Sequence, residues 1–349
     1  MSEYIALDSH RRYSWVDRED HSGKNRSHRL DHAPGAVRTY LSRCAPGTPV
    51  AVEATGNWYW IVEEIEQAHC EPRLVHARKA KLMMGLINKT DRLDARGLNR
   101  LQRNGTLPTV WIPPGPLRDL RELTRSRLML TAERTRLKNR ISATLAKYGI
   151  PPSERSDRFS RRGREELIQD LQRLPEQTRW VSDQLLAQLD FVSGQISQLE
   201  QRLEQLVEIS ESMQRLMTLP GVAEILGATI ALEIGEVSRF PSAAHLASYA
   251  GTTPRVHASG GKVRYGPVRN DVNRYLKWAF AEAANSVAVN HRRHPERHVS
   301  RLYQRVRRKG HAKAVGAVAR HLAESAFHVL SKQQAYRDPL LDRGCTNPG

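Results

Sequence analysis

Two carboxylates three residues apart mark the stretch Lys89-Thr90-Asp91-Arg92-Leu93-Asp94-Ala95-Arg96. On a helix this spacing places both side chains on one face, with Cβ atoms about 5–6 Å apart. Two ionised carboxylates held so close repel each other, and a divalent cation is the usual remedy. The stretch therefore predicts a helix that presents Asp91 and Asp94 to a metal ion. A solvated helix face that carries two aspartates is the competing interpretation.

Two further carboxylates lie upstream, each at the end of a short apolar run. Asp8 follows residues 4–7, and Glu53 follows residues 49–52. If the two runs are neighbouring strands, their ends and the aspartate helix together form a site of oxygen ligands for a hard cation. Such a site is typical of phosphoryl transfer. Taken singly, a charged residue after an apolar run often marks only the point where a strand reaches water.

The first 110 residues predict an α/β domain of the ribonuclease H-like class. Three hairpin-linked strands are followed by alternating helices and strands, which is the order that this fold requires. Such a domain carries acidic groups on its first strand, at the end of its fourth strand and on its last helix. The expected elements are strands at 4–8, 13–16 and 26–30, a helix at 36–44, a strand at 50–53, a helix at 57–68, a strand at 73–76 and a helix that carries Asp91.

The composition indicates a polyanion partner. The chain has 349 residues and 55 Lys+Arg against 37 Asp+Glu, a formal net charge of +18. The length favours more than one domain, and the charge favours nucleic acid or a membrane surface. No apolar run is long enough to span a bilayer, and no signal peptide is visible. Cys44, Cys70 and Cys345 are unclustered, so we expect a reduced protein in the cytoplasm. With nucleic acid as the expected partner, we expect it to be associated with the nucleoid.

The middle of the chain, residues 111–212, predicts a helical coiled-coil arm. Prolines in residues 111–116 form a linker, an arginine-rich helix follows, and Pro151-Pro152 ends it. After Pro175 the apolar residues alternate steps of four and three, which is a heptad seam. The second helix can pair with the first in one chain or with a second subunit. The seam comprises Leu185, Leu189, Val192, Ile196, Leu199, Leu203 and Leu206.

Residues 213–335 predict a mainly helical C-terminal domain, and residues 336–349 a disordered tail. Within the domain, Leu219-Pro220-Gly221-Val222 is similar to a helix-hairpin-helix turn, whose amides suit a DNA phosphate. A plain glycine turn between helices is the alternative. Residues 291–313 are densely basic, which favours contact with a nucleic-acid backbone. We expect such contact from Arg292, Arg293, Arg307, Arg308 and Lys309.

Ser259 is a candidate nucleophile in a flexible, glycine-containing loop at residues 249–266. It is the only serine between Ser248 and Ser286. Its surroundings are basic, which suits a phosphate substrate. An isolated loop serine is more often a solvated turn residue, and His257 is a conceivable base if the two side chains converge. The basic residues near the serine are Arg255, Lys262, Arg264 and Arg269.

These motifs, in this order and at these intervals, resemble one family along nearly the whole chain. It is the family of insertion-sequence transposases of the IS-one-ten type, related to the Piv/MooV DNA invertases. The resemblance is carried by Ile5-Ala6-Leu7-Asp8, Val52-Glu53-Ala54-Thr55-Gly56, residues 89–96, Leu219-Pro220-Gly221-Val222, Tyr249-Ala250-Gly251-Thr252-Thr253-Pro254-Arg255 and Ser259-Gly260.

The resemblance implies a RuvC-like DEDD domain at residues 1–110, a coiled-coil middle and a C-terminal transposase domain with a nucleophilic serine. Ser259 lies where the family has its serine, in a Pro-Arg-x-x-x-Ser-Gly context. Gly260-Gly261-Lys262 follow it, where some relatives have further serines. The implied Mg²⁺ ligands are Asp8, Glu53, Asp91 and Asp94.

The resemblance also implies partners: donor and target DNA, a noncoding bridge RNA, and further copies of the chain, as dimers that assemble to a tetramer. The expected activity is DNA recombination through a serine–phosphodiester link. A RuvC-type nuclease that hydrolyses DNA junctions is one alternative. A nucleic-acid-binding scaffold without catalysis is the other.

Overall fold

The computed structural model describes residues 3–20, 22–85, 90–152, 157–208, 210–268 and 271–340. The chain forms two compact units, Met1–Pro113 and Pro114–Gly349. The boundary falls inside the predicted proline linker. Each unit has its own core.

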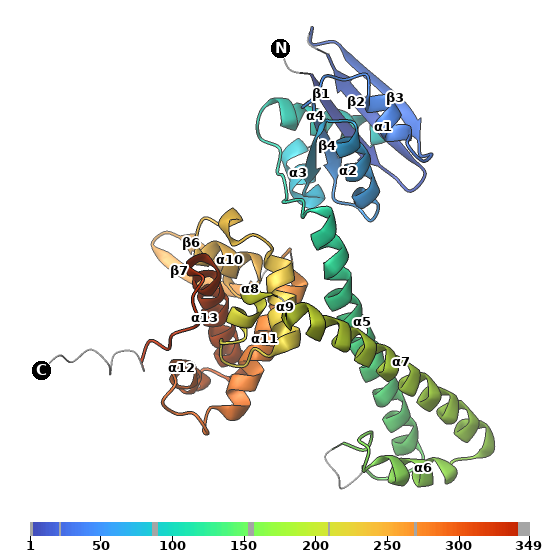
Figure 1. The fold of residues 1–349 in the computed structure, drawn as a ribbon, viewed down its shortest axis with the longest axis vertical. Coiled ribbons are helices and arrows are strands. Elements are labelled where there is room, and N and C mark those ends of the chain that lie inside the picture. The colour runs from blue at the N-terminus through green and yellow to red at the C-terminus, as the bar shows by residue number, and fades with distance from the viewer. Residues whose placement is uncertain are drawn as a thin grey trace, which may run out of the picture. The chain divides into compact units, whose positions relative to one another are not determined.

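The first unit is an α/β domain built on a five-stranded sheet of order β3-β2-β1-β4-β5 (Figure 1). Strands β1, β2 and β3 pair antiparallel, whereas β1, β4 and β5 run parallel. The predicted succession of strands and helices is confirmed, with one additional helix, α3. The elements are β1 (Tyr4–Ser9), β2 (Tyr13–Glu19), β3 (Asn25–Asp31), α1 (Ala36–Leu41), β4 (Pro49–Glu53), α2 (Trp58–Gln67), β5 (Glu71–Val75), α3 (Ala77–Met84) and α4 (Asp91–Arg103).

The two faces of the sheet differ in the size of their side chains. Ile5 and Leu7 pack in one core with residues of α1 and α2. Alternate residues point to the opposite face, where Ala6 and Ala51 pack against α3 and α4. Because alanine is small, α4 can lie close to the central strands on this face.

Polar side chains fix α4 on the sheet. Asn99 donates to the buried carboxylate of Asp17 at 3.0 Å, and Gln102 donates to the carbonyl oxygen of Ile5 at 3.0 Å. Both residues lie near the C-terminal end of α4, and Ile5 lies near the start of β1. The helix therefore runs antiparallel to β1, and its first residues lie at the end of β1 that carries Asp8.

The second unit begins with three helices: α5 (Gly115–Lys147), α6 (Arg164–Gln172) and α7 (Glu176–Glu208). Helices α5 and α7 lie side by side in opposite directions, with α6 at the far end (Figure 1). Most of the predicted seam packs inside this chain, since Leu189 and Ile196 share a core with Ile141 and Leu167. The structure therefore favours the pairing within one chain. Helix α6 was not expected.

The remainder of the second unit is helical, with one hairpin. The predicted division after residue 212 is not a break in packing, because Leu203 of α7 and Leu117 of α5 share a cluster with Met213 and Leu232. The elements are α8 (Glu211–Leu216), α9 (Glu224–Ile234), η1 (Val237–Arg239), α10 (Ala243–Tyr249), β6 (Pro254–Ser259), β7 (Lys262–Val268), α11 (Arg274–Asn290), α12 (His298–Arg307) and α13 (His311–Lys332).

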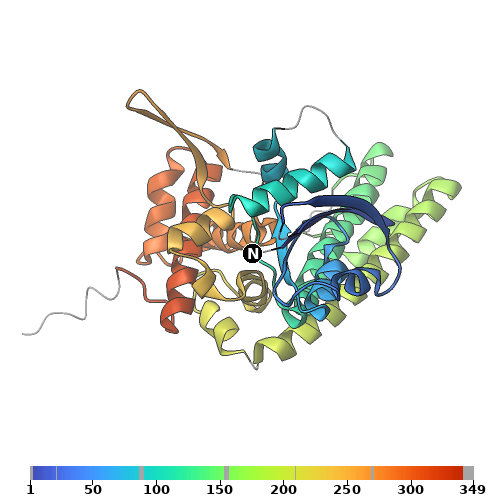
Figure 2. The same cartoon turned by 90° about the horizontal axis from the view of Figure 1, so that it is seen from above.

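Two predictions for the second unit are wrong in part. Most of the loop expected at 249–266 is the β6–β7 hairpin, which stands out from the helices (Figure 2). Residues 336–340 of the expected tail are packed: the Tyr336 amide donates to Thr218 Oγ1 at 2.8 Å, and the Asp338 carboxylate accepts from the His298 amide at 3.0 Å. Residues 341–349, with Cys345, lie outside the described residues. None of the described helices is long and apolar enough to cross a membrane.

Candidate active site

Asp8 and Glu53 lie at the same end of neighbouring parallel strands. The register pairs Leu7 with Val52, so each acid comes one residue after that pair. Because side chains alternate between faces, both acids point to the face of Ala6, which is the face covered by α4. The predicted placement of two carboxylates at adjacent strand ends is therefore reproduced.

Asp91 and Asp94 both lie in the first turn of α4. The hydroxyl of Thr90 caps this helix by accepting from the Leu93 amide at 3.3 Å. The free amides at a helix N-terminus carry partial positive charge, which stabilises carboxylates there. Two aspartates can thus be held close together without depending on a cation alone.

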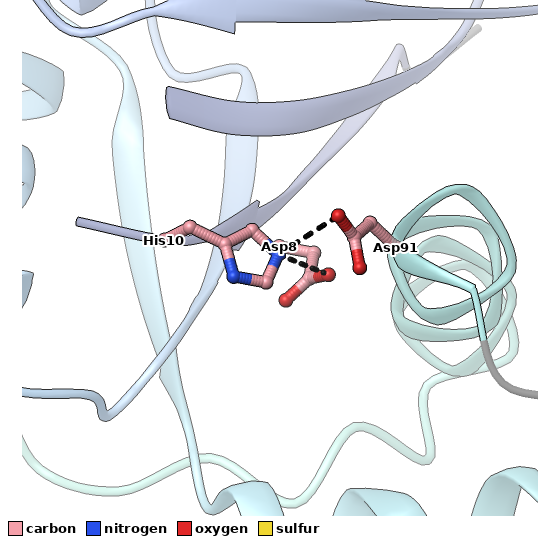
Figure 3. A group of neighbouring side chains, drawn as sticks. All are labelled: Asp8, His10 and Asp91. Carbon is pink, nitrogen blue, oxygen red and sulfur yellow. Dashed lines mark ion pairs between the residues drawn. The ribbon is translucent and has the colours of Figure 1, made fainter. Parts of the chain in front are cut away.

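Asp8, His10 and Asp91 form a tight group (Figure 3). Nε2 of His10 lies 3.3 Å from Oδ2 of Asp8 and 3.2 Å from Oδ2 of Asp91. One candidate ligand atom from each residue lies within 4.8 Å of the other two. The Tyr13 hydroxyl donates to the same Asp91 oxygen at 2.8 Å. Asp8 and Asp91, which are 83 positions apart in the chain, therefore lie next to each other in the fold.

The carboxylates of Asp8 and Asp91 repel each other, so a positive charge between them would be stabilising. Burial raises the pKa of Asp8 above its ordinary value, His10 lowers it, and the charges of Asp94 and Asp91 raise it again. The hydrogen bond to Asp91 raises the pKa of Tyr13, because a phenolate would lose it. A divalent cation would offset the repulsion between the carboxylates, and carboxylate oxygens with an imidazole nitrogen are a donor set that such cations accept. The residues present fit a metal ion.

The four predicted acids are not equally close. Asp8 and Asp91 belong to the group of three, and Asp94 acts on Asp8 through its charge. Glu53 and Asp94 lie outside that group among the described residues. His10 was missed by sequence reasoning. Its signal was the position two residues after Asp8, where a side chain leaving the strand end returns to the same face.

Ser259 lies at the tip of the serine hairpin, which we define as residues 254–268. The register pairs Ser259 with Lys262 and His257 with Arg264. Paired residues share a face of a hairpin, so the serine side also carries Arg255 and is polar and basic. The opposite face is apolar: Val256, Ala258, Val263 and Tyr265. All nine of these side chains are exposed.

The base of the serine hairpin is held by a buried ion network. The Glu233 carboxylate is fully buried. It accepts two hydrogen bonds from Arg125 at 2.7 and 3.0 Å and one from the Asn273 amide group at 2.8 Å. The backbone amide of Asn273 in turn donates to the Tyr249 carbonyl at 2.9 Å. Tyr249 and Asn273 flank the hairpin, so this network fixes where its two strands leave the helices.

The other predicted nucleic-acid contacts lie on exposed basic segments. Arg292 and Arg293 are in the turn after α11. Arg307 ends α12, and Arg308 and Lys309 follow it directly. Arg269 lies outside the described residues, as does Lys89 of the aspartate stretch.

Comparison with known families identifies the chain. Residues 6–150 match the profile of the IS110-type DEDD transposases, and residues 213–301 match that of the "Transposase IS116/IS110/IS902 family". The chain belongs to the IS116/IS110/IS902 family of transposases. Its first profile spans the acidic group and all of α5, and its second includes the serine hairpin.

Individual relatives agree with this family. The chain is 25% identical over 334 residues to a protein of Pseudomonas aeruginosa named "Probable family 20 transposase", covering 92% of this chain and 94% of the relative. It is 24% identical over 250 residues to the transposase for insertion sequence element IS1111A of Coxiella burnetii, covering 72% and 69%. It is 29% identical over 151 residues to the pilin gene-inverting protein of Moraxella bovis, covering 41% and 46%.

Membership of this transposase family implies DNA as the substrate and DNA transposition or recombination as the activity. The DEDD profile and the acidic group together indicate use of a divalent metal. The family resemblance expected from the sequence motifs is thereby confirmed.

Proposed function

We propose that the chain is a DNA recombinase whose first unit is a RuvC-like domain with a Mg²⁺-dependent DEDD site. The meeting of Asp8 with Asp91 carries this proposal, because a strand end and a helix start far apart in sequence bring two acids to one point. Asp94 and Glu53 complete the proposed ligand set. His10 joins them as a group that holds the two carboxylates in place.

Mg²⁺ bound by these acids would offset charge on a scissile phosphate. The remaining work falls to the chain's own residues. Asp8, Glu53, Asp91 and Asp94 hold their carboxylates at one edge of the sheet. Because the Asp8 carboxylate is buried and α4 is fixed by Asn99 and Gln102, little reorganisation is needed when a phosphate arrives.

We further propose that Ser259 is the nucleophile. Its Oγ forms a bond to phosphorus, the bond from phosphorus to one strand breaks, and that strand leaves as a hydroxyl with the serine proton. The phosphoserine link keeps the phosphodiester energy for rejoining. Lys262 and Arg264 share the hairpin with Ser259, and as cations they suit the non-bridging oxygens.

The test is to trap protein–DNA adducts on cognate ends with Mg²⁺. We expect covalent adducts from the wild type and none from Ser259→Ala, whose fold is preserved because the residue is exposed. The matched control is Ser331→Ala, an exposed serine on α13. Adducts formed by Ser259→Ala contradict the serine role.

The same assay separates the alternatives. Free 5′-phosphate ends without adducts favour a RuvC-type nuclease, and no Mg²⁺-dependent breakage at all favours a binding scaffold. We also propose, from the family resemblance, that a noncoding bridge RNA guides the enzyme and that dimers assemble to a tetramer. Sequencing of nucleic acid that copurifies with the protein tests the guide: a discrete small RNA is expected, and its absence contradicts the proposal.

A further inference from the structure

The turn between α8 and α9 packs directly on the backbone of α11. Gly221 has a positive φ of 79°, and a Cβ there would lie 2.3 Å from the carbonyl oxygen of Ala283. Only glycine allows this approach. The turn and the α11 face that carries Ala283 therefore meet without a side chain between them.

A small polar cavity lies beside this contact. Its volume is about 110 Å³, and its lining includes the Pro220–Gly221 turn, Ser286 and Asn290 of α11, and Ser300 of α12. Ser286 and Asn290 lie three and seven residues after Ala283, so they continue the same face of α11. His294 and Arg297, from the segment between α11 and α12, close the cavity.

The cavity contains hydrogen-bonding capacity that the described residues do not use. Ser300 is 2% exposed and is one of the polar residues that line the cavity. Arg297 is half-buried and forms no ion pair within the described part of the chain. A guanidinium gains most from an acceptor that carries negative charge, because charge-assisted hydrogen bonds are the stronger ones. A ligand that accepts hydrogen bonds and carries negative charge would therefore suit Arg297 and the polar residues beside it.

The charge around the cavity favours an anion. The guanidinium of Arg297 supplies positive charge, and the first turn of α12 adds the partial positive charge of a helix N-terminus. Two acids lie nearby and are already engaged: Glu296 is 3.7 Å from Nδ1 of His294, and Asp338 caps the His298 amide. One hydrogen of the Asn290 amide group is used by the Ser286 carbonyl at 2.9 Å, which leaves the other.

We infer that this cavity binds one phosphodiester group of a nucleic acid. A guanidinium, two hydroxyls and an amide group supply donors, and the cavity has room for a small tetrahedral anion. Phosphate contacts of this kind fix the register of a protein on a nucleic acid without reading its sequence. The inference rests on the proposed function only in taking nucleic acid as the substrate.

Binding in the absence of chemistry tests the site. A labelled DNA duplex and a labelled single-stranded RNA are titrated with full-length Ser259→Ala protein in EDTA, over a range of salt concentrations. When Arg297→Gln or Ser286→Asp is introduced into this Ser259→Ala protein, we expect its affinity for the nucleic acid to fall about tenfold. A hydrogen bond to a charged group contributes about 1.5 kcal/mol or more. The slope of log affinity against log salt should fall by about one.

Two control variants make the same charge changes elsewhere. Ser197→Asp adds one negative charge at an exposed position on α7, and Arg173→Gln removes an exposed cation at the end of α6. We expect both to bind within about twofold of the parent, as exposed charges contribute little. Thermal unfolding checks the fold, and Ser300→Ala is a further variant that removes only the buried hydroxyl.

The outcomes separate this site from the catalytic proposal. Weaker binding of the duplex alone, of the RNA alone or of both supports a phosphodiester site. Which probe is affected shows whether DNA, RNA or either supplies the phosphodiester. Wild-type affinity and salt slope for all three cavity variants, with both nucleic acids, overturn it. Neither result depends on metal or on Ser259, so failure of the serine mechanism would leave this measurement unaffected.

Discussion

The acidic group and the serine hairpin are built in opposite ways. Asp8 is buried at a strand end in the centre of a sheet, and Asp91 starts a helix that hydrogen bonds fix to that sheet. Ser259 lies at the tip of a two-stranded ribbon with both faces exposed. The first site is held by hydrogen bonds between α4 and the sheet. In the part of the chain that the structure describes, the contacts that hold the second site lie at its base, at Tyr249 and Asn273.

The difference follows from the chemistry that each site can support. Carboxylates that repel each other stay together only if the surrounding fold supplies the energy, so they need a rigid framework. A serine hydroxyl is neutral and carries no such cost, so it can be carried on an exposed ribbon. A two-stranded ribbon alone is marginally stable, which makes the buried network at its base important.

The largest effect is expected on catalysis from Asp8→Asn or Asp91→Asn. Each removes one negative charge from the group around His10 and should lower Mg²⁺-dependent strand cleavage by about a thousandfold. The thermal midpoint without metal should hold or rise, because repulsion is relieved. The control is Asp31→Asn, an exposed acid that pairs with Arg29 on β3. Cleavage at the wild-type rate by both acid variants would contradict the metal role.

The next effect is on stability, from Glu233→Gln at the base of the serine hairpin. The change takes the partner charge from Arg125 and from the buried Arg121, whose pKa burial already lowers. We expect a loss of about 3 kcal/mol in the free energy of unfolding of the second unit, measured in urea. Glu200→Gln, at a carboxylate that is 33% exposed rather than fully buried, should cost less than about 1 kcal/mol. Equal losses would show that burial of the pair is not the cause.

A smaller loss is expected from Asn99→Ala in the first unit. Asp17 is fully buried, and removal of the Asn99 amide leaves one of its oxygens without that donor. The expected cost is about 2 kcal/mol, seen in the unfolding transition of the first unit. Asn25→Ala, at an exposed position on β3, should change little. No loss from Asn99→Ala would mean that α4 is held by apolar packing alone.

The smallest effect is expected from Tyr265→Ser on the apolar face of the serine hairpin. The side chain is 73% exposed, so little buried surface is lost. The free energy of unfolding should change by less than about 0.5 kcal/mol in thermal or urea unfolding. Tyr249→Ser, at the base of the same hairpin, serves as the contrasting variant and should cost clearly more. A large loss from Tyr265→Ser would show that the exposed face is covered in the folded protein.

Sequence reasoning succeeded where a pattern is local. Short apolar runs identified β1 and β4, and the heptad steps identified α7. It failed where single contacts decide. His10 joins the acids through its place after the strand, and Tyr336 and Asp338 turn an expected tail into packed structure. The glycines at 260 and 261 indicated a loop, but they form the turn of a hairpin.

The sequence by itself determined the apolar runs of β1 and β4, the heptad spacing of α7, and that two acids share the first turn of α4, because these properties depend on neighbours within a few positions. The meeting of Asp8, His10 and Asp91, the burial of Glu233 and the cavity beside Gly221 were decided only by tertiary structure. Each joins residues from separate elements, and the distances between them depend on how helices pack on strands and on one another rather than on any local period.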